Sequence, residues 1–121
     1  MAFITYSESI DFSLLEQYFE LLGEEGIRES LATLQKLMPE YIGEAEGLAA
    51  AQDEANFRRQ AHKIKGGCRS LGFIRLGKLM EYLEREPWDW TQVTEAIAQW
   101  RAWLPEDLQS VQNWLYTKVS Q

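Results

Sequence analysis

Hydrophobic residues recur every three or four positions in five consecutive segments of this chain. No segment shows the sustained alternation of apolar and polar positions that is typical of a half-buried strand. Helical spacing places the apolar side chains of each segment on one face, which must pack against another helix to be stable. We therefore expect an all-α protein with helices over about residues 11–22, 24–51, 54–71, 73–85 and 91–118.

The two longest segments, 24–51 and 91–118, each carry an apolar seam and a proline. Because proline removes one backbone hydrogen bond, we expect Pro39 to bend the first and Pro105 to kink or split the second. The seams consist of Ile27, Leu31, Leu34, Met38, Tyr41, Ala45 and Leu48, and of Val93, Ile97, Trp100, Leu104, Leu108, Val111 and Leu115.

The three shorter segments are bounded by residues that begin or end helices. Asp11 and Asp53 stand at N-cap positions, Gly23 and Gly72 follow helix ends, and Pro87 stops the fourth segment. Four long segments with short loops predict an antiparallel up-down four-helix bundle, with the short first helix as an addition. The inward positions are Phe12, Leu15, Phe19 and Leu22; Phe57, Ala61, Ile64, Cys68 and Leu71; and Phe73, Leu76, Met80 and Leu83.

Composition narrows the classes of function. The 121 residues suit a single domain over 1–121, and the net charge of −7 disfavours binding to nucleic acid or to an anionic membrane surface. No apolar run approaches the roughly 18 residues of a membrane span, and the N-terminus does not have the pattern of a secretory signal. The single cysteine, Cys68, excludes an intrachain disulfide and suits a cytoplasmic protein. One histidine and one cysteine also disfavour a zinc site.

The basic residues are concentrated around the only histidine, His62. Between Ala55 and Met80 the chain has seven Lys or Arg and no Asp or Glu. Such a patch would attract an anionic partner or a phosphoryl group, although a merely solvated face would have the same pattern. His62 points away from the apolar stripe of its helix. The outer face around it is expected to carry Arg58, Arg59, Lys65, Gly66 and Arg69.

His62 has the chemistry of a phosphoryl acceptor. A neutral imidazole has one nitrogen lone pair that can attack an activated phosphorus, and Lys65 is close enough to offset the new charge. Gly66 and Gly67 lie inside the helix, where each costs roughly 1 kcal/mol relative to alanine. Gly66 leaves the imidazole open to another surface, whereas Gly67 fits tight helix packing better. The alternative is that His62 is an ordinary surface histidine.

Residues 61–66, AHKIKG, followed by Gly72, resemble the motif of histidine-containing phosphotransfer (HPt) domains. Over most of residues 10–86 the chain also looks like the phosphotransfer domain of Arc-type anaerobic sensor kinases. The resemblance implies a four-helix bundle core with an extra N-terminal helix. It also implies phosphorylation at Nε2 of His62, stabilisation of the phosphoryl group by Lys65, and docking room at Gly66. Arg58 and Arg69 are further candidates for stabilisation or docking.

One position departs from the Arc-type pattern, in which a glutamine on the following helix often faces the histidine. Glu84 stands at that place here. A carboxylate could accept a hydrogen bond from Nδ1–H and hold the tautomer, but it would also repel a phosphoryl group. Glu84 could equally be a surface residue.

The resemblance implies a phosphorelay intermediate in two-component signalling. Such a module accepts a phosphoryl group from the aspartyl phosphate of one receiver domain and passes it to another. Its partners are response-regulator receiver domains and a hybrid sensor kinase, and the receiver domain supplies the Mg²⁺, so we expect no cofactor or metal in this chain. The sequence has no Gly-rich nucleotide loop, Walker A motif or kinase signature, so we expect no ATP site and no ordinary enzyme activity. Because relay contacts are transient, we expect a small interface and a monomer.

Other classes of function use the same residues. A helical adaptor would bind a signalling partner through the basic patch without phosphorylation. A hydrolase using Cys68 and His62 is disfavoured, because residues six apart on a helix point about 120° from each other. The acidic balance and the long seams oppose a helix-turn-helix. Candidate apolar docking residues are exposed members of Leu71, Phe73 and Ile74, although packing in the core is favoured for each.

Overall fold

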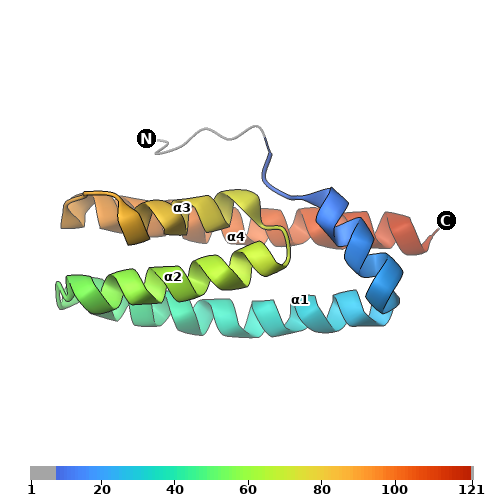
Figure 1. Cartoon of the computed structure of the whole chain (residues 1–121), viewed down its shortest axis with the longest axis horizontal. Coiled ribbons are helices and arrows are strands. Elements are labelled where there is room, and N and C mark those ends of the chain that lie inside the picture. The colour runs from blue at the N-terminus through green and yellow to red at the C-terminus, as the bar shows by residue number, and fades with distance from the viewer. Residues whose placement is uncertain (1–7, 121) are drawn as a thin grey trace.

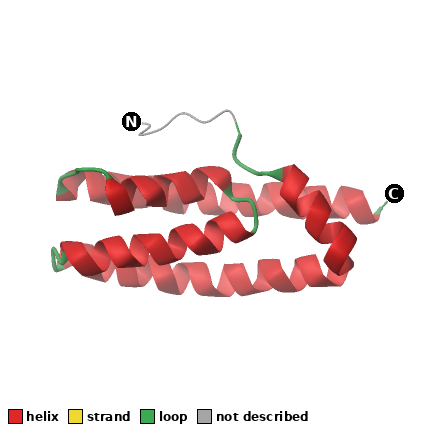
Figure 2. Ribbon diagram, viewed as in Figure 1, coloured by secondary structure: helices red, strands yellow, loops and turns green. Residues whose placement is uncertain are grey.

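The computed structural model describes residues 8–120, which form an antiparallel four-helix bundle without strands (Figure 1). Short loops join the helices (Figure 2), and contacts between α1 and α2, α2 and α3, α3 and α4, and α4 and α1 close the ring. This arrangement confirms the predicted all-α bundle. The helices are α1 (Phe12–Ala50), α2 (Glu54–Ser70), α3 (Ile74–Arg85) and α4 (Trp90–Val119).

The two helices predicted at 11–22 and 24–51 form one run, α1, with a kink at Gly23. Gly23 has a φ of +72°, a left-handed conformation that favours glycine, and it alone departs from helical dihedral angles within α1. Residues 12–22, which we call the N-terminal arm, therefore run in a different direction from the rest of α1 (Figure 1). The arm contacts α4, where Glu16 accepts hydrogen bonds from Trp114 and Lys118.

Only part of the predicted apolar face of the N-terminal arm is buried. Leu15 is fully buried, and Phe19 packs edge-on against the ring of Trp114. Phe12 and Leu22, which were expected to face inward, are exposed. The arm crosses the bundle instead of running within it, so only the middle of its stripe reaches the core.

Neither internal proline ends its helix. α1 continues through Pro39, and α4 is not split at Pro105, so the expectation of a split is wrong. Buried side chains lie on both sides of each proline, and this packing holds the helix together where one backbone hydrogen bond is missing. The predicted seam positions are buried except Tyr41, Leu48, Leu104 and Leu108, which are half-buried.

The turn between α2 and α3 is attached to the start of the described chain. Gly72 has a φ of +78°, and its carbonyl oxygen accepts a hydrogen bond from the amide of Asp11 at 2.8 Å. The amide of Ile74 donates to the carbonyl oxygen of Ser9 at 2.9 Å, so the two segments form a short antiparallel bridge. A Cβ on Gly72 would lie 3.0 Å from the oxygen of Asp11, which leaves room there for glycine alone. The bridge fixes the turn that joins α2 to α3.

Candidate functional site

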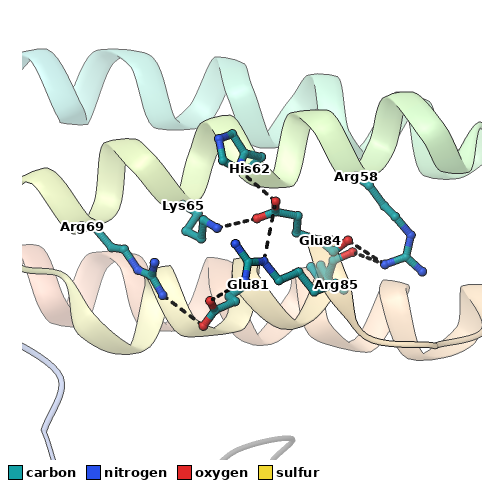
Figure 3. Close-up of polar contacts among 8 residues, drawn as sticks. Arg58, His62, Lys65, Arg69, Glu81, Glu84 and Arg85 are labelled. Carbon is teal, nitrogen blue, oxygen red and sulfur yellow. Dashed lines mark hydrogen bonds and ion pairs between the residues drawn. The ribbon is translucent and has the colours of Figure 1, made fainter.

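His62 projects from the outward face of α2 (Figure 3). The buried stripe of α2, which includes Ala61 and Ile64, faces the core, so a residue one position along the helix must point elsewhere. The His62 side chain is 66% exposed. The predicted exposure of the imidazole is therefore confirmed.

Glu84, on α3, contacts the imidazole. Its Oε2 lies 2.9 Å from Nδ1 of His62, and its side chain is only 18% exposed. The interpretation of Glu84 as an unengaged surface residue is therefore wrong. An ionised carboxylate can only accept hydrogen bonds, so this contact requires the proton of a neutral His62 to be on Nδ1. The lone pair of Nε2 then remains available.

Lys65 lies between α2 and α3 and not on the outer face, where it was expected. Its side chain is 6% exposed, and its Nζ lies 2.6 Å from Oε1 of Glu84. Lys65 is three residues after His62, about 60° round the helix, and this rotation turns it toward α3. Its ammonium group is therefore engaged by Glu84 and does not stand free beside the imidazole (Figure 3).

The contacts of Glu84 favour its ionised form. Burial alone would raise its pKa, because desolvation disfavours a charged group. The hydrogen bonds from Lys65 and His62 outweigh this effect and hold the pKa of Glu84 below its ordinary value of 4.5. The site is therefore a cation–carboxylate–imidazole chain at neutral pH.

We expect part of the stability of the domain to be lost in acid through Glu84. A carboxyl group whose folded pKa is lowered contributes stability above its unfolded pKa, near 4.5, and this contribution is lost as the pH falls through the folded pKa. Urea denaturation of wild type and Glu84→Gln between neutral and acidic pH measures it. The free energy of unfolding of wild type should fall more steeply below pH 4.5. Parallel curves for the two proteins would contradict the expectation.

Arg58 supports the end of α3. Its Nη1 donates to the carbonyl oxygens of Leu83 at 3.1 Å and Glu84 at 2.9 Å, and its Nε pairs with Glu54. Its guanidinium carbon also lies 4.2 Å from the ring centroid of Trp88. These contacts occupy the guanidinium group that was expected to stabilise the phosphoryl group or to dock a partner. They fix the backbone that carries Glu84 (Figure 3).

The basic cluster around His62 is largely offset by carboxylates. All of these acids lie outside residues 55–80, and all except Glu54 meet the cluster only in the folded bundle, so the sequence pattern did not reveal them. Arg69, the other docking candidate, is exposed and pairs with Glu81 at 3.0 Å. The surface around His62 is therefore of mixed charge. The ion pairs are Arg58–Glu54, Lys65–Glu84, Arg69–Glu81, and Arg75 with Glu106 and Asp107.

The two glycines of α2 differ, as the sequence predicts. A Cβ on Gly66 would meet no heavy atom within 4 Å, whereas one on Gly67 would lie 3.0 Å from Cε of Met38. Gly66 is exposed on the His62 side of α2 and leaves bare backbone beside the imidazole. Of the apolar docking candidates, Leu71 and Phe73 are buried and only Ile74 is half-buried. Packing against neighbouring helices occupies the first two.

Cys68 has no reactive character. It is fully buried, and burial, with a smaller effect of Asp107, raises the pKa of its thiol to about 12. A buried and protonated thiol is a poor nucleophile, so the structure opposes the hydrolase alternative. Within residues 8–120, no group of three His, Cys, Asp or Glu side chains is placed to bind a metal ion, and no helix is long and apolar enough for a membrane span.

Comparisons with known proteins agree with this geometry. Residues 29–114 match the family model of the Hpt domain. The aerobic respiration control sensor protein ArcB of Escherichia coli K12 is 37% identical over 75 residues, which cover 62% of this chain and 10% of ArcB. The sensor protein TorS of the same organism is 29% identical over 113 residues, 89% of this chain and 12% of TorS. The chain thus spans about a tenth of the length of these curated relatives.

Solved structures give the same result. The histidine-containing phosphotransfer domain of ArcB from E. coli superposes with a TM-score of 0.81 and 31% identity, covering 90% of this chain and 94% of that one. A solution structure of the same domain gives a TM-score of 0.82, also at 31% identity, covering 95% and 94%. The sequence match, the four-helix architecture and the exposed histidine on α2 together show that this chain belongs to the Hpt domain family.

Proposed function

We propose that the chain carries a phosphoryl group on Nε2 of His62 between receiver domains of a two-component phosphorelay. The exposed imidazole, held at Nδ1 by Glu84, is the observation that carries the proposal. The bare backbone at Gly66 supports it, because it gives a partner surface room to approach. Membership of the Hpt domain family agrees with this role.

The transfer needs one nucleophile from this chain. The lone pair of Nε2 attacks the phosphorus of a receiver aspartyl phosphate, and the Nε2–P bond forms as the P–O bond to the aspartate breaks. The bonding electrons leave with the aspartate carboxylate, and transfer to a second receiver reverses these changes. The receiver domain supplies the aspartate and Mg²⁺, so we propose that this chain acts without a cofactor or an ATP site of its own.

The proposed partners are response-regulator receiver domains and a hybrid sensor kinase. The mixed charge around His62 suits a transient contact steered by a few exposed basic groups such as Arg59. We propose that the module works as a monomer in the cytoplasm.

Incubation with a radiolabelled, phosphorylated receiver domain and Mg²⁺ tests the function. The label should move to this chain and should be stable in alkali and lost in acid, as expected for a phosphoramidate. Stable binding to receivers without any transfer of label, across several receivers, would support the adaptor alternative instead.

We expect Gly66→Leu to impair transfer without loss of stability. The leucine side chain would enter open space beside His62, where a receiver must approach, so the transfer rate should fall at least about tenfold. Replacing an exposed helical glycine with a good helix former should raise the free energy of unfolding by up to about 1 kcal/mol.

Gly43→Leu is the matched control. Gly43 is also exposed and helical, with no heavy atom within 4 Å of an added Cβ, but it lies on α1. This variant should gain similar stability and transfer at the wild-type rate. Normal transfer by Gly66→Leu would contradict the role of Gly66 as an approach surface.

A further inference from the structure

We propose that a groove between the N-terminal arm, α1 and α2 binds a small amphipathic monocarboxylate. The carboxylate of this ligand pairs with Lys63, and its hydrocarbon part packs against the apolar lining of the groove. The inference concerns a site apart from the His62 imidazole and does not depend on phosphoryl transfer.

The kink at Gly23 builds the groove. Because the N-terminal arm turns away from the direction of α1 at this residue, Tyr18 and Leu22 of the arm form one wall, and side chains of α1 and α2 form the rest. The groove has a volume of about 510 Å³. Pockets that hold small molecules typically measure roughly 300–1,000 Å³, so the groove is large enough for such a ligand.

The lining of the groove is mostly apolar. Buried Leu34, Met38 and Leu71 and half-buried Leu37 contribute to it. Leu22 also lines the groove, and it is 54% exposed, so a bound hydrocarbon chain would remove apolar surface from water. The flexible side chain of Met38 adapts to the shape of a ligand more readily than a branched one.

The hydroxyl groups of the lining are already engaged by the protein. Ser30, Thr33 and Ser70 donate hydrogen bonds to carbonyl oxygens of their own helices at 3.0, 3.0 and 2.7 Å. Their donors therefore need no partner from a ligand, and a hydrocarbon chain can lie beside them without leaving them unsatisfied.

Lys63 supplies the only charge of the lining, which contains no Asp or Glu. Its Nζ lies 4.1 Å from the ring centroid of Tyr41. Within residues 8–120 no carboxylate pairs with Lys63, whereas Lys65 and Arg69 both have such a partner in this acidic chain. One unpaired ammonium group at an apolar groove matches one negative charge at the end of an apolar molecule. This match favours a monocarboxylate over a neutral or cationic ligand.

NMR titration of the free protein with octanoate tests the site. Octanoate should shift the backbone amide signals of groove residues such as Leu37, Lys63 and Gly67. It should bind roughly fivefold more tightly than octanol, which has the same chain without the charge, and octylammonium should bind most weakly. Equal affinities for octanoate and octylammonium, or shifts confined to residues outside the groove, would overturn the inference.

The variant Lys63→Gln tests the contact with the carboxylate. It should weaken octanoate binding roughly fivefold and leave octanol binding unchanged. Lys36→Gln is the matched control, because Lys36 is an exposed lysine of α1 that does not line the groove. Octanoate affinity that is the same in both variants would contradict the role of Lys63.

The variant Leu22→Ser tests the contact with the hydrocarbon chain. It should weaken octanoate and octanol binding alike, by roughly fivefold, because less apolar surface is buried in the complex. Leu21→Ser is the matched control, since Leu21 is the adjacent residue, is 80% exposed and does not line the groove. Both positions are exposed, so neither variant should lose helicity. Equal effects of the two substitutions would show that the chain does not lie against the arm.

Light scattering at the protein concentrations of the titration tests a second copy as the occupant. The mass should be that of one chain with and without octanoate. A dimer that dissociates as octanoate binds would assign the groove to a second copy of this chain and would overturn the proposal.

Discussion

Replacing His62 by glutamine is expected to abolish phosphoryl transfer while the four-helix bundle remains folded. Glutamine has no ring nitrogen whose lone pair can attack phosphorus, and His62 is the only histidine of the chain, so no other imidazole can take its place. The 66% exposed side chain contributes little packing. The amide of the introduced glutamine can also donate to Glu84, so the carboxylate keeps a partner.

The experiment compares wild type and His62→Gln in the same transfer reaction. The label on the variant should fall to background, and the free energy of unfolding should change by less than about 1 kcal/mol. Acid-labile label on His62→Gln would show that another residue accepts the phosphoryl group. A large loss of helicity would contradict the exposed position of the ring.

Replacing Arg75 by methionine is expected to destabilise the bundle more than any other single substitution proposed above. Asp107 on α4 is 1% exposed, and its oxygens accept hydrogen bonds from Nε of Arg75 at 3.0 and 3.1 Å and from Nη2 at 2.7 Å. Burial raises the pKa of Asp107 despite the opposing effect of Arg75, so the carboxylate depends on this partner. Removing one member of a buried pair leaves an uncompensated charge and costs about 3–5 kcal/mol.

Urea denaturation of three variants measures this effect. The free energy of unfolding should fall most for Arg75→Met alone. The double variant Arg75→Met/Asp107→Leu should recover most of that loss, because neither charge of the pair remains. Arg69→Met, which breaks the exposed pair with Glu81, is the matched control. Its free energy of unfolding should fall by no more than about 1 kcal/mol. Equal losses for Arg75→Met and Arg69→Met would contradict a buried structural pair.

The fold could be predicted because the core of a bundle repeats with the period of its helices. The buried faces of α2 and α3 follow that period throughout, so each predicted inward position of these helices is buried. The N-terminal arm was predicted less well. Its apolar residues have the same spacing, but the direction set by the kink at Gly23 decides which of them reach the core. The hydrophobic pattern alone does not predict the direction in which the N-terminal arm runs.

The candidate site was predicted only in part. Positions that depend on the period of one helix were predicted, whereas contacts that depend on the register between helices were not. His62 and Gly66 lie on the outer face of one helix, and their exposure follows from the helical period alone. Several of the ion pairs join residues on different helices, such as Arg75 and Asp107, which are 32 positions apart. The register between helices decides these pairs, so a count of charges along the sequence could not show that Lys65 is buried against Glu84.

The bridge between residues 9–11 and the turn at 72–74 limits how far the domain can be shortened from its N-terminal side. The family match begins at residue 29. The turn that joins α2 to α3, however, is hydrogen-bonded to backbone groups of Ser9 and Asp11, well before that residue. A fragment trimmed to 29–114 would deprive Gly72 and Ile74 of these partners and would uncover the Trp114 face that the arm protects. The folded unit therefore includes the backbone from Ser9 onward, about twenty residues before the family match begins.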